Sequence, residues 1–270
     1  MTAIKENIFR IREEIARICR EVGRDPKEIT LVAVTKFAPG EAIQEAIDCG
    51  ITDVAENKVQ EGLKKYPSLS ELPSSKQNSK TLASMDSASE SFRVGKEKLN
   101  KSSTSQRILK RHLIGHLQTN KVKDALKIFD FIQSVDSLKL AQEIDKQSQK
   151  ANRRMEILVQ VNISGEEQKF GMNKNEALDL VGKILELKNI QILGLMTMAP
   201  LTEDQKMIRD CFKGLREFKD KVLGDFKGNP QMNMKFLSMG MSGDYPIALE
   251  EGSNMIRIGS AIFKENFLKG

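Results

Sequence analysis

Eight short apolar runs of strand type, alternating with segments of helical spacing, limit what this sequence can fold into. The runs cover residues 29–36, 52–57, 112–117, 131–136, 156–163, 190–198, 234–241 and 255–263. Strands that alternate with helices close most simply into a (β/α)8 barrel, and a doubly wound open sheet is the competing arrangement. We therefore predict an α/β chain with a single TIM-type barrel domain over residues 1–270.

The N-terminal segment predicts one helix in addition to those of the barrel. Isoleucines at positions 4, 8, 11, 15 and 18 fall on a single stripe of this helix, and such a stripe favours packing on an apolar surface. The segment mixes Glu with Lys and Arg, unlike a signal or transit peptide. The sequence has no run of about 18 apolar residues that could cross a membrane. We expect a cytoplasmic protein that does not bind membranes.

The positive charge of the chain is concentrated in one window. The net charge is +6, and residues 64–127 hold fourteen Lys or Arg against five Asp or Glu. Much of this window is the stretch 68–106, in which twelve of thirty-nine residues are Ser. Such a composition buries too little apolar surface to offset its ordering entropy, so we expect a disordered or loosely ordered insertion. The stretch lacks interleaved aromatic residues, and we predict no nucleic-acid binding.

Cysteine and histidine are too sparse to predict a metal site. Cys19, Cys49 and Cys211 are odd in number and far apart, which argues against a disulfide framework and against zinc. His112 and His116 are the two histidines, and their even spacing predicts that both face the same side of one strand. They lack further ligands at suitable spacing, so we predict no metal.

Polar residues gather where the predicted strands end. They are Lys36, Asn57, His116, Asn162 and Thr197. The carboxyl ends of barrel strands share one rim, which is where barrel enzymes place their chemistry. The loops after the last two predicted strands add Gly240, Ser242, Gly243, Gly259 and Ser260. Backbone N–H groups of glycine and hydroxyls of serine suit a phosphate, although both residue types are also common in plain turns.

Lys36, on the opposite side of this rim, favours a phosphate site over plain turns as the interpretation of these loops. A lysine in a dry barrel mouth has its pKa lowered by desolvation, which frees the amine to attack an aldehyde. The alternative is that Lys36 only extends to solvent or pairs with a carboxylate. A phosphate cup that faces a reactive lysine fits an aldehyde that carries a phosphate, and pyridoxal 5'-phosphate (PLP) is the commonest such cofactor.

Several motifs, in order, resemble those of the pyridoxal-phosphate homeostasis proteins, a family similar to the barrel domain of alanine racemase. They are VAVTKF, AENKVQEGL, HLIGHLQTNK, QSVDS, VNISGEEQKFG, GLMTM and LSMGMSGDYPIALEEGSNMIRIGSAIF. The resemblance covers nearly the whole chain except 68–106. It implies that Lys36 holds PLP as a Schiff base and that Asn57 lies beside the ring. It also implies that Ser242, Gly259 and Ser260 hold the phosphate and that Arg257 faces the pyridine nitrogen.

Two further residues complete the predicted cofactor-binding set. We predict that His116 forms a hydrogen-bonded wall of the pocket. The set also includes Met196 on the sixth strand, although methionines such as Met196 are typical of the filling of irregular gaps rather than of ligand binding.

The chain departs from the usual family pattern at a few positions. Val54 and Ala55 stand where relatives usually have Phe-Gly, Arg111 stands where they usually have Trp, and Lys264 stands where they usually have Gly. None of these changes removes a predicted cofactor contact. The loss of the Trp bears on packing around the second and third strands.

The resemblance implies a protein that carries or buffers PLP without robust catalysis. An arginine at the pyridine nitrogen keeps that atom unprotonated and weakens the ring as an electron sink. A racemase also needs a second acid or base, and related racemases use a tyrosine, whereas this chain has only Tyr66 and Tyr245. The alternatives are a PLP-dependent amino-acid racemase and a Schiff-base aldolase for sugar phosphates. We expect a monomer whose partners are PLP and apo PLP-dependent enzymes.

Overall fold

The chain forms a closed barrel of parallel strands, as predicted. The computed structural model describes residues 2–70, 109–165, 171–229 and 232–264. Within these ranges the strands pair in the order β1 to β8, and β8 closes on β1. The strands are β1 (Thr30–Val34), β2 (Asp53–Glu56), β3 (Lys110–Leu113), β4 (Phe131–Val135), β5 (Met155–Gln160), β6 (Ile190–Met196), β7 (Phe236–Ser238) and β8 (Met255–Ile258).

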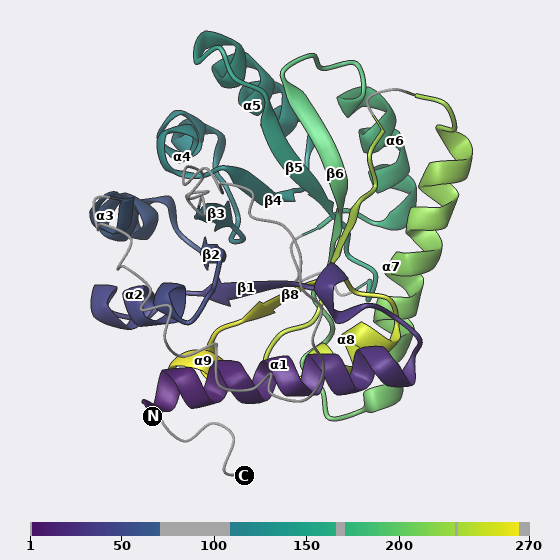
Figure 1. Ribbon diagram of the computed structural model, residues 1–270. Coiled ribbons are helices and arrows are strands. Elements are labelled where there is room, and N and C mark those ends of the chain that lie inside the picture. Colours follow the sequence, from purple (N-terminus) through teal and green to yellow (C-terminus); the bar gives the residue numbers. More distant parts are fainter. Residues whose placement is uncertain (1, 71–108, 166–170, 230–231, 265–270) are drawn as a thin grey trace, which may run out of the picture.

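Helices surround this barrel and alternate with its strands (Figure 1). They are α1 (Ala3–Glu21), α2 (Gly40–Asp48), α3 (Val59–Ser70), α4 (Val122–Ile128), α5 (Leu138–Lys150), α6 (Lys174–Ile184), α7 (Gln205–Asp225), α8 (Tyr245–Glu250) and α9 (Ser260–Phe263), with short 3-10 turns η1 (Pro26–Glu28) and η2 (Thr119–Lys121). Several helices begin at a side-chain cap. Asn173 caps α6 and Asp204 caps α7, each accepting from two backbone N–H groups.

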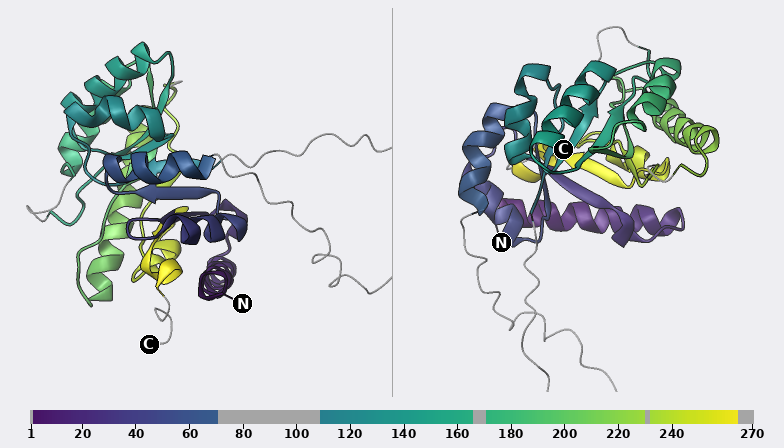
Figure 2. Two further views of the ribbon diagram at one scale, coloured as in Figure 1. Left: turned by 90° about the vertical axis from the view of Figure 1, so that its left-hand side faces the viewer. Right: turned by 90° about the horizontal axis from the view of Figure 1, so that it is seen from above.

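The additional N-terminal helix α1 packs on the outside of the barrel, beside α2, α8 and α9 (Figures 1 and 2). Its buried face carries Ile8, Ile11, Ile15 and Ile18, which confirms the predicted stripe. The buried Asn7 side chain donates to the carbonyl of Ile262 over 3.0 Å. This bond ties the N-terminal helix to the last helix, so both ends of the described chain meet on one side of the barrel.

Side chains of the strands alternate between two apolar layers. One layer lies between the strands and the helices, and the other fills the barrel interior. The buried residues of the interior layer are Val32, Ala55, Phe131, Leu158, Leu193, Met196, Phe236 and Met255. Because each strand contributes alternate residues to this layer, the register decides which side chains can reach the barrel mouth.

The predicted strands run further along the chain than the observed ones, and three of these differences bear on the site. Strand β1 ends at Val34 rather than at residue 36, and residues 260–263 form α9 instead of continuing β8. Strand β3 ends at Leu113, so the expectation that His112 and His116 share one face of a strand is wrong. Apolar runs overshoot in this way because hydrophobicity does not separate the end of a buried strand from the start of the next element.

The predicted insertion over 68–106 lies outside the described residues except for its first residues, which belong to α3. The three cysteines are free thiols, and burial raises the pKa of Cys19 and of Cys49. Over the described ranges, no group of His, Cys, Asp or Glu side chains is arranged to hold a metal ion. Among the helices of the same ranges, none has the length and apolar character needed to cross a membrane.

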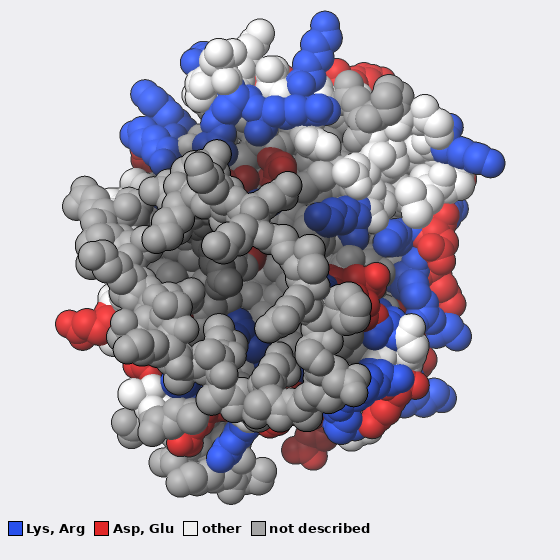
Figure 3. Space-filling view, in the orientation of Figure 1, with Lys and Arg blue, Asp and Glu red and all other residues white. Residues whose placement is uncertain are grey.

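Charged side chains of both signs are interspersed on the described part of the surface. Figure 3 shows Lys and Arg next to Asp and Glu along the edge formed by α7. Pairs such as Lys213 with Glu217, 3.8 Å apart, follow the helical spacing. Such exposed pairs contribute little to stability, and the surface they form is an ordinary solvated one.

The packing of α1 makes a direct prediction about stability. Ile11 is fully buried, whereas Phe9 on the opposite side of the same helix is 58% exposed. Ile11→Ala should lower the free energy of unfolding by about 2–5 kcal/mol, because it removes buried methyl groups and leaves a cavity. Phe9→Ala, the matched control, should change it by less than about 1 kcal/mol. Equal effects in urea-unfolding curves would show that α1 does not pack as described.

Candidate functional site

Lys36 lies in the turn that follows β1, at the carboxyl end of the strand. Val32 and Val34, which precede it with alternate spacing, contribute to the interior layer. The Lys36 side chain is exposed, and its Nζ lies 4.9 Å from the centroid of the Phe37 ring. The expectation of a dry, enclosed lysine is therefore wrong in this structure, because Lys36 stands in the exposed turn that follows β1. An amine in this position is accessible to molecules that enter the mouth.

A buried polar cluster fixes the backbone immediately before Lys36. The Thr35 hydroxyl donates to Glu56 Oε1 over 2.8 Å, and Lys65 Nζ donates to the same oxygen over 2.7 Å. Lys65 Nζ also donates to the carbonyl of Thr35 over 2.8 Å. The Tyr66 hydroxyl lies 3.1 Å from Thr35 Oγ1. These bonds join the end of β1 to β2 and α3 and hold it in one position, while the second carboxylate oxygen of Glu56, Oε2, is buried without a hydrogen-bond partner.

Asn57 follows β2 and presents an unsatisfied acceptor at the same rim. Its Oδ1 is buried and has no hydrogen-bond partner. A buried polar atom without a partner is costly, and in native proteins it commonly marks a ligand or catalytic position. The segment after β3 passes very close to this residue, since a Cβ added to Gly115 would lie 2.1 Å from the Asn57 carbonyl oxygen. Glycine at this position is therefore required for the two loops to meet.

The loops after β7 and β8 meet each other and the end of β1, because β8 pairs with β1. The expectation that Lys36 lies on the opposite side of the rim from these loops is therefore wrong. Ser242 Oγ accepts from the backbone N–H of Ala261 over 3.3 Å. A Cβ added to Gly259 would lie 3.2 Å from the Val34 carbonyl oxygen. Ser260 begins α9 directly after this contact. The serines and glycines predicted to form a phosphate cup are thus brought together next to the end of the strand that leads to Lys36.

Arg257 supplies a buried positive charge to this site. It lies on β8, is 3% exposed, and donates to Ser238 Oγ over 2.6 Å and to the Thr197 carbonyl over 2.9 Å. Burial lowers the pKa of Arg257 to about 10, and the attraction of Asp244 opposes that shift. The guanidinium therefore stays cationic at neutral pH. No carboxylate forms an ion pair with it within the described ranges.

Met196 and His116, the other two predicted residues, differ in their burial. Met196 ends β6, is 1% exposed and belongs to the interior layer. His116 lies in the loop after β3, with its Nδ1 3.3 Å from Asp136 Oδ2 and its side chain 39% exposed. Met196 can therefore contact a ligand that reaches into the barrel, whereas the role of His116 as a pocket wall stays a prediction.

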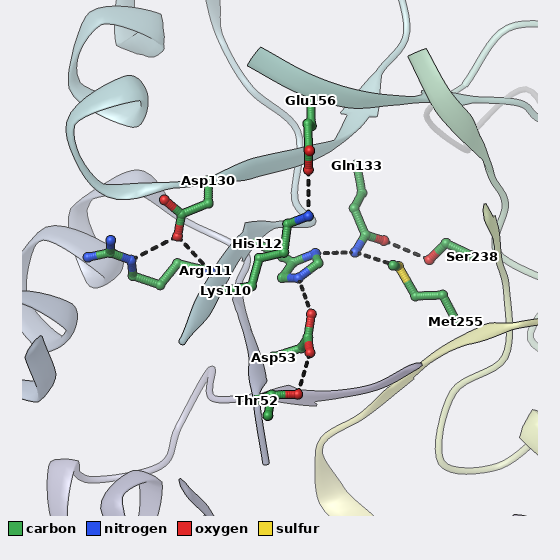
Figure 4. Close-up of polar contacts among 10 residues, drawn as sticks. All are labelled: Thr52, Asp53, Lys110, Arg111, His112, Asp130, Gln133, Glu156, Ser238 and Met255. Carbon is green, nitrogen blue, oxygen red and sulfur yellow. Dashed lines mark hydrogen bonds and ion pairs between the residues drawn. The ribbon is translucent and has the colours of Figure 1, made fainter. Parts of the chain in front are cut away.

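Of the residues that depart from the family pattern, Arg111 and Val54 lie outside the barrel interior, and Ala55 packs within it. Arg111 points out of the barrel, where its Nε donates to Asp130 Oδ2 over 3.0 Å (Figure 4). Val54 packs in the outer apolar layer and Ala55 in the interior one. An ion pair between Arg111 and Asp130 thus occupies the place of the usual Trp.

Further polar residues of the interior were not among the predicted site residues. His112, Gln133 and Ser238 are completely buried, and Figure 4 shows them converging inside the barrel. The alternation of strand residues could have revealed them, because Gln133 and Ser238 each stand two positions after an interior phenylalanine. Polar side chains at such positions are rare without a function or a full set of partners.

The chain is similar to one described family, to named relatives and to solved structures. Residues 3–266 match the family described as alanine racemase, N-terminal domain. A pyridoxal phosphate homeostasis protein of Aquifex aeolicus is 34% identical over 260 residues, covering 96% of this chain and 97% of the relative. A solved structure of an unknown protein from Bifidobacterium adolescentis has a TM-score of 0.82 and 32% identity, covering 97% of this chain and 94% of its own. PipY of Synechococcus elongatus PCC7942, solved with PLP bound, has a TM-score of 0.74 and 29% identity, covering 96% of this chain and 99% of its own.

The close approach of the β2 and β3 loops predicts the effect of one methyl group. Gly115→Ala would place its Cβ against the Asn57 carbonyl, so the loops must separate and the free energy of unfolding should fall by about 1–3 kcal/mol. Gly224→Ala is the control, because nothing lies within 4 Å of the added Cβ in α7. That substitution should be neutral or stabilising by up to about 1 kcal/mol. If denaturant unfolding finds the two variants equally stable, the loops do not meet as described.

Proposed function

Because the chain belongs to the pyridoxal phosphate homeostasis proteins, within the alanine racemase N-terminal-domain family, we propose that it binds PLP and carries or buffers this cofactor without robust catalysis. The relative from Aquifex aeolicus is named for PLP homeostasis, and PipY has been solved with PLP bound. The arrangement of Lys36, Arg257 and the loops after β7 and β8 around one mouth supports the same ligand for this chain.

The residues at the mouth fit the three ends of PLP. Lys36 is the amine that would hold the aldehyde carbon as a Schiff base. Ser242, Gly259 and Ser260 would hold the phosphate, since hydroxyls and close backbone N–H groups suit an anion. Arg257 would face the pyridine nitrogen as a hydrogen-bond donor. When bound, PLP offers its ring as an electron sink for carbanions at an amino-acid α carbon.

The buried positive charge of Arg257 is the observation that favours a carrier over an enzyme. A buried cation disfavours a second positive charge, so a pyridine nitrogen beside it stays unprotonated. An unprotonated ring is a weaker electron sink, and abstraction of an α proton is correspondingly unfavourable. The site therefore suits holding the aldehyde more than driving chemistry on it.

Neither tyrosine of the chain is placed to act as a second acid or base. Tyr66 is fully buried on α3, where it packs edge-on against Phe129 with ring centroids 5.9 Å apart. Tyr245 donates from its hydroxyl to Glu14 of α1 over 2.6 Å. Burial raises the pKa of both phenols. Tyr66 and Tyr245 are thus held by the outer layers of the fold, which disfavours a racemase.

A racemase is the second candidate because the matching family is named after alanine racemase. It would use Lys36 as one base and would need another proton donor at the mouth. His116, in the loop after β3, is a titratable candidate for this donor, although its Nδ1 faces Asp136. The carrier requires no such group.

A carrier also needs recipients and an open path to its cofactor. Apo forms of PLP-dependent enzymes are the partners we propose, together with a cytoplasmic location and a monomeric state that binds no nucleic acid. The exposed position of Lys36 supports exchange with such partners, since the amine is reached directly from solvent.

The assignment of Lys36 is tested by trapping the bound cofactor. Protein loaded with PLP should show an imine absorption band that borohydride removes, with the reduced adduct on Lys36 by mass mapping. Lys36→Ala should lose the band and the adduct and keep the fold, because the Lys36 side chain is exposed. Lys58→Ala, an exposed lysine beside Asn57, is the matched control and should keep both. An adduct on Lys58 or Lys121 would defeat the assignment.

A further inference from the structure

A row of buried polar side chains crosses the barrel interior and ends on Arg257. The first two hydrogen bonds of the row are its shortest. Arg257 Nη1 lies 2.6 Å from Ser238 Oγ, and Ser238 Oγ lies 2.6 Å from Gln133 Oε1. Ser238 is on β7 and Gln133 is on β4, so these bonds join opposite sides of the barrel.

The row continues from Gln133 to the other end of the barrel (Figure 4). Gln133 Nε2 lies 2.9 Å from His112 Nδ1 and 3.3 Å from Met255 Sδ. His112 Nε2 lies 3.0 Å from Asp53 Oδ1. The hydroxyl of Thr52 donates to the second oxygen of Asp53 over 2.7 Å. Every polar atom of the Gln133 amide therefore has a partner.

The partners fix the direction of each hydrogen bond. A guanidinium only donates, so Ser238 accepts from Arg257 and gives its own proton to the Gln133 oxygen. The Gln133 amino group then faces Met255 and His112, a thioether and a ring nitrogen that both accept. His112 is therefore neutral with its proton on Nε2, from which it donates to Asp53. All bonds point from the cation to the carboxylate.

Charge and burial favour this single arrangement at neutral pH. Burial lowers the pKa of His112, which outweighs the hydrogen bond to Asp53 that would raise it. Burial also disfavours ionised Asp53, but hydrogen bonds from His112 and Thr52 outweigh it and lower the pKa of this carboxyl. A reversed Gln133 amide would need a protonated His112, which the buried site disfavours.

We propose that His112, Gln133 and Ser238 are positioning residues for PLP, which act through Arg257 by holding its guanidinium in the orientation that faces the pyridine nitrogen. This inference rests on the proposed function, because it requires PLP in the mouth. The guanidinium forms no ion pair among the residues in the described ranges. Its orientation depends instead on Ser238 and on the Thr197 carbonyl. Hydrogen bonds that all point the same way polarise one another in a low dielectric. Gln133 and His112 therefore strengthen the hydrogen bond between Arg257 and Ser238.

The test replaces Gln133 by a side chain of similar length whose thioether accepts only weakly from Ser238 and cannot donate to His112. Gln133→Met should raise the dissociation constant of PLP about tenfold or more, since a buried hydrogen-bond chain to a charged group is broken. It should also shift the imine absorption band and the 15N resonance of labelled PLP at the ring nitrogen. Leu158→Met, another fully buried interior residue, is the matched control and should leave affinity and spectra as in the wild type.

A second variant asks whether the row acts as a unit. Ser238→Ala removes the acceptor of Arg257 directly, and it should weaken PLP binding at least as much as Gln133→Met. Because both substitutions break the same chain, the double variant should bind PLP no more weakly than Ser238→Ala alone. Strictly additive effects would overturn the proposal, and so would equal affinity and spectra of Gln133→Met and Leu158→Met.

The unmodified protein gives a test that no folding defect can obscure. The 15N spectrum of histidine-labelled, PLP-loaded protein should show His112 neutral with its proton on Nε2 near pH 7, with His116→Gln used to assign the two histidines. A proton on Nδ1, or a charged ring, would contradict the direction of the row. If borohydride fixes no PLP on Lys36 of the wild type, the proposed function fails; if it does and the tautomer or variants disagree, only the positioning role fails.

Discussion

The arrangement of the barrel mouth depends on one buried cation, the guanidinium of Arg257. A charge in an apolar interior is costly unless hydrogen bonds satisfy it. Here Ser238 and the Thr197 carbonyl accept from it, and Asp244 attracts it from a distance. The strands β6, β7 and β8 must keep their register for these acceptors to reach it. The chemistry of the site follows from the same charge, because it opposes protonation of a pyridine ring placed beside it.

The remainder of the mouth combines a fixed frame with an exposed amine. The ion pair of Glu56 with Lys65 holds the backbone of Thr35, and Gly115 lets the neighbouring loop approach Asn57. Lys36 itself, one residue further, projects to solvent. A rigid frame that ends in an accessible lysine suits a protein that takes up and releases an aldehyde. An enzyme would instead enclose its reacting groups to exclude water.

The barrel could be predicted from the sequence because its strands and helices alternate with clear periodicity. The rim residues could be predicted because strand ends share one edge, and the structure does bring Ser242 to α9 and Gly259 to β1. The burial of Lys36 was predicted wrongly, since a pattern of apolar residues does not show where a chain turns. The row through Gln133 was not predicted, because it joins strands β2, β3, β4, β7 and β8 across the barrel. Contacts of this kind depend on the closure of the sheet and leave no local pattern.

We propose above all that the protein holds PLP for delivery without turning over an amino acid. The most direct measurement follows two quantities for PLP-loaded protein: racemisation of L- and D-alanine, and reactivation of an apo PLP-dependent enzyme. We expect racemisation no faster than with free PLP, together with transfer of the bound cofactor to the apo enzyme. Turnover on the order of 1 s⁻¹, within the usual range for enzymes, that vanished in Lys36→Ala would contradict the account.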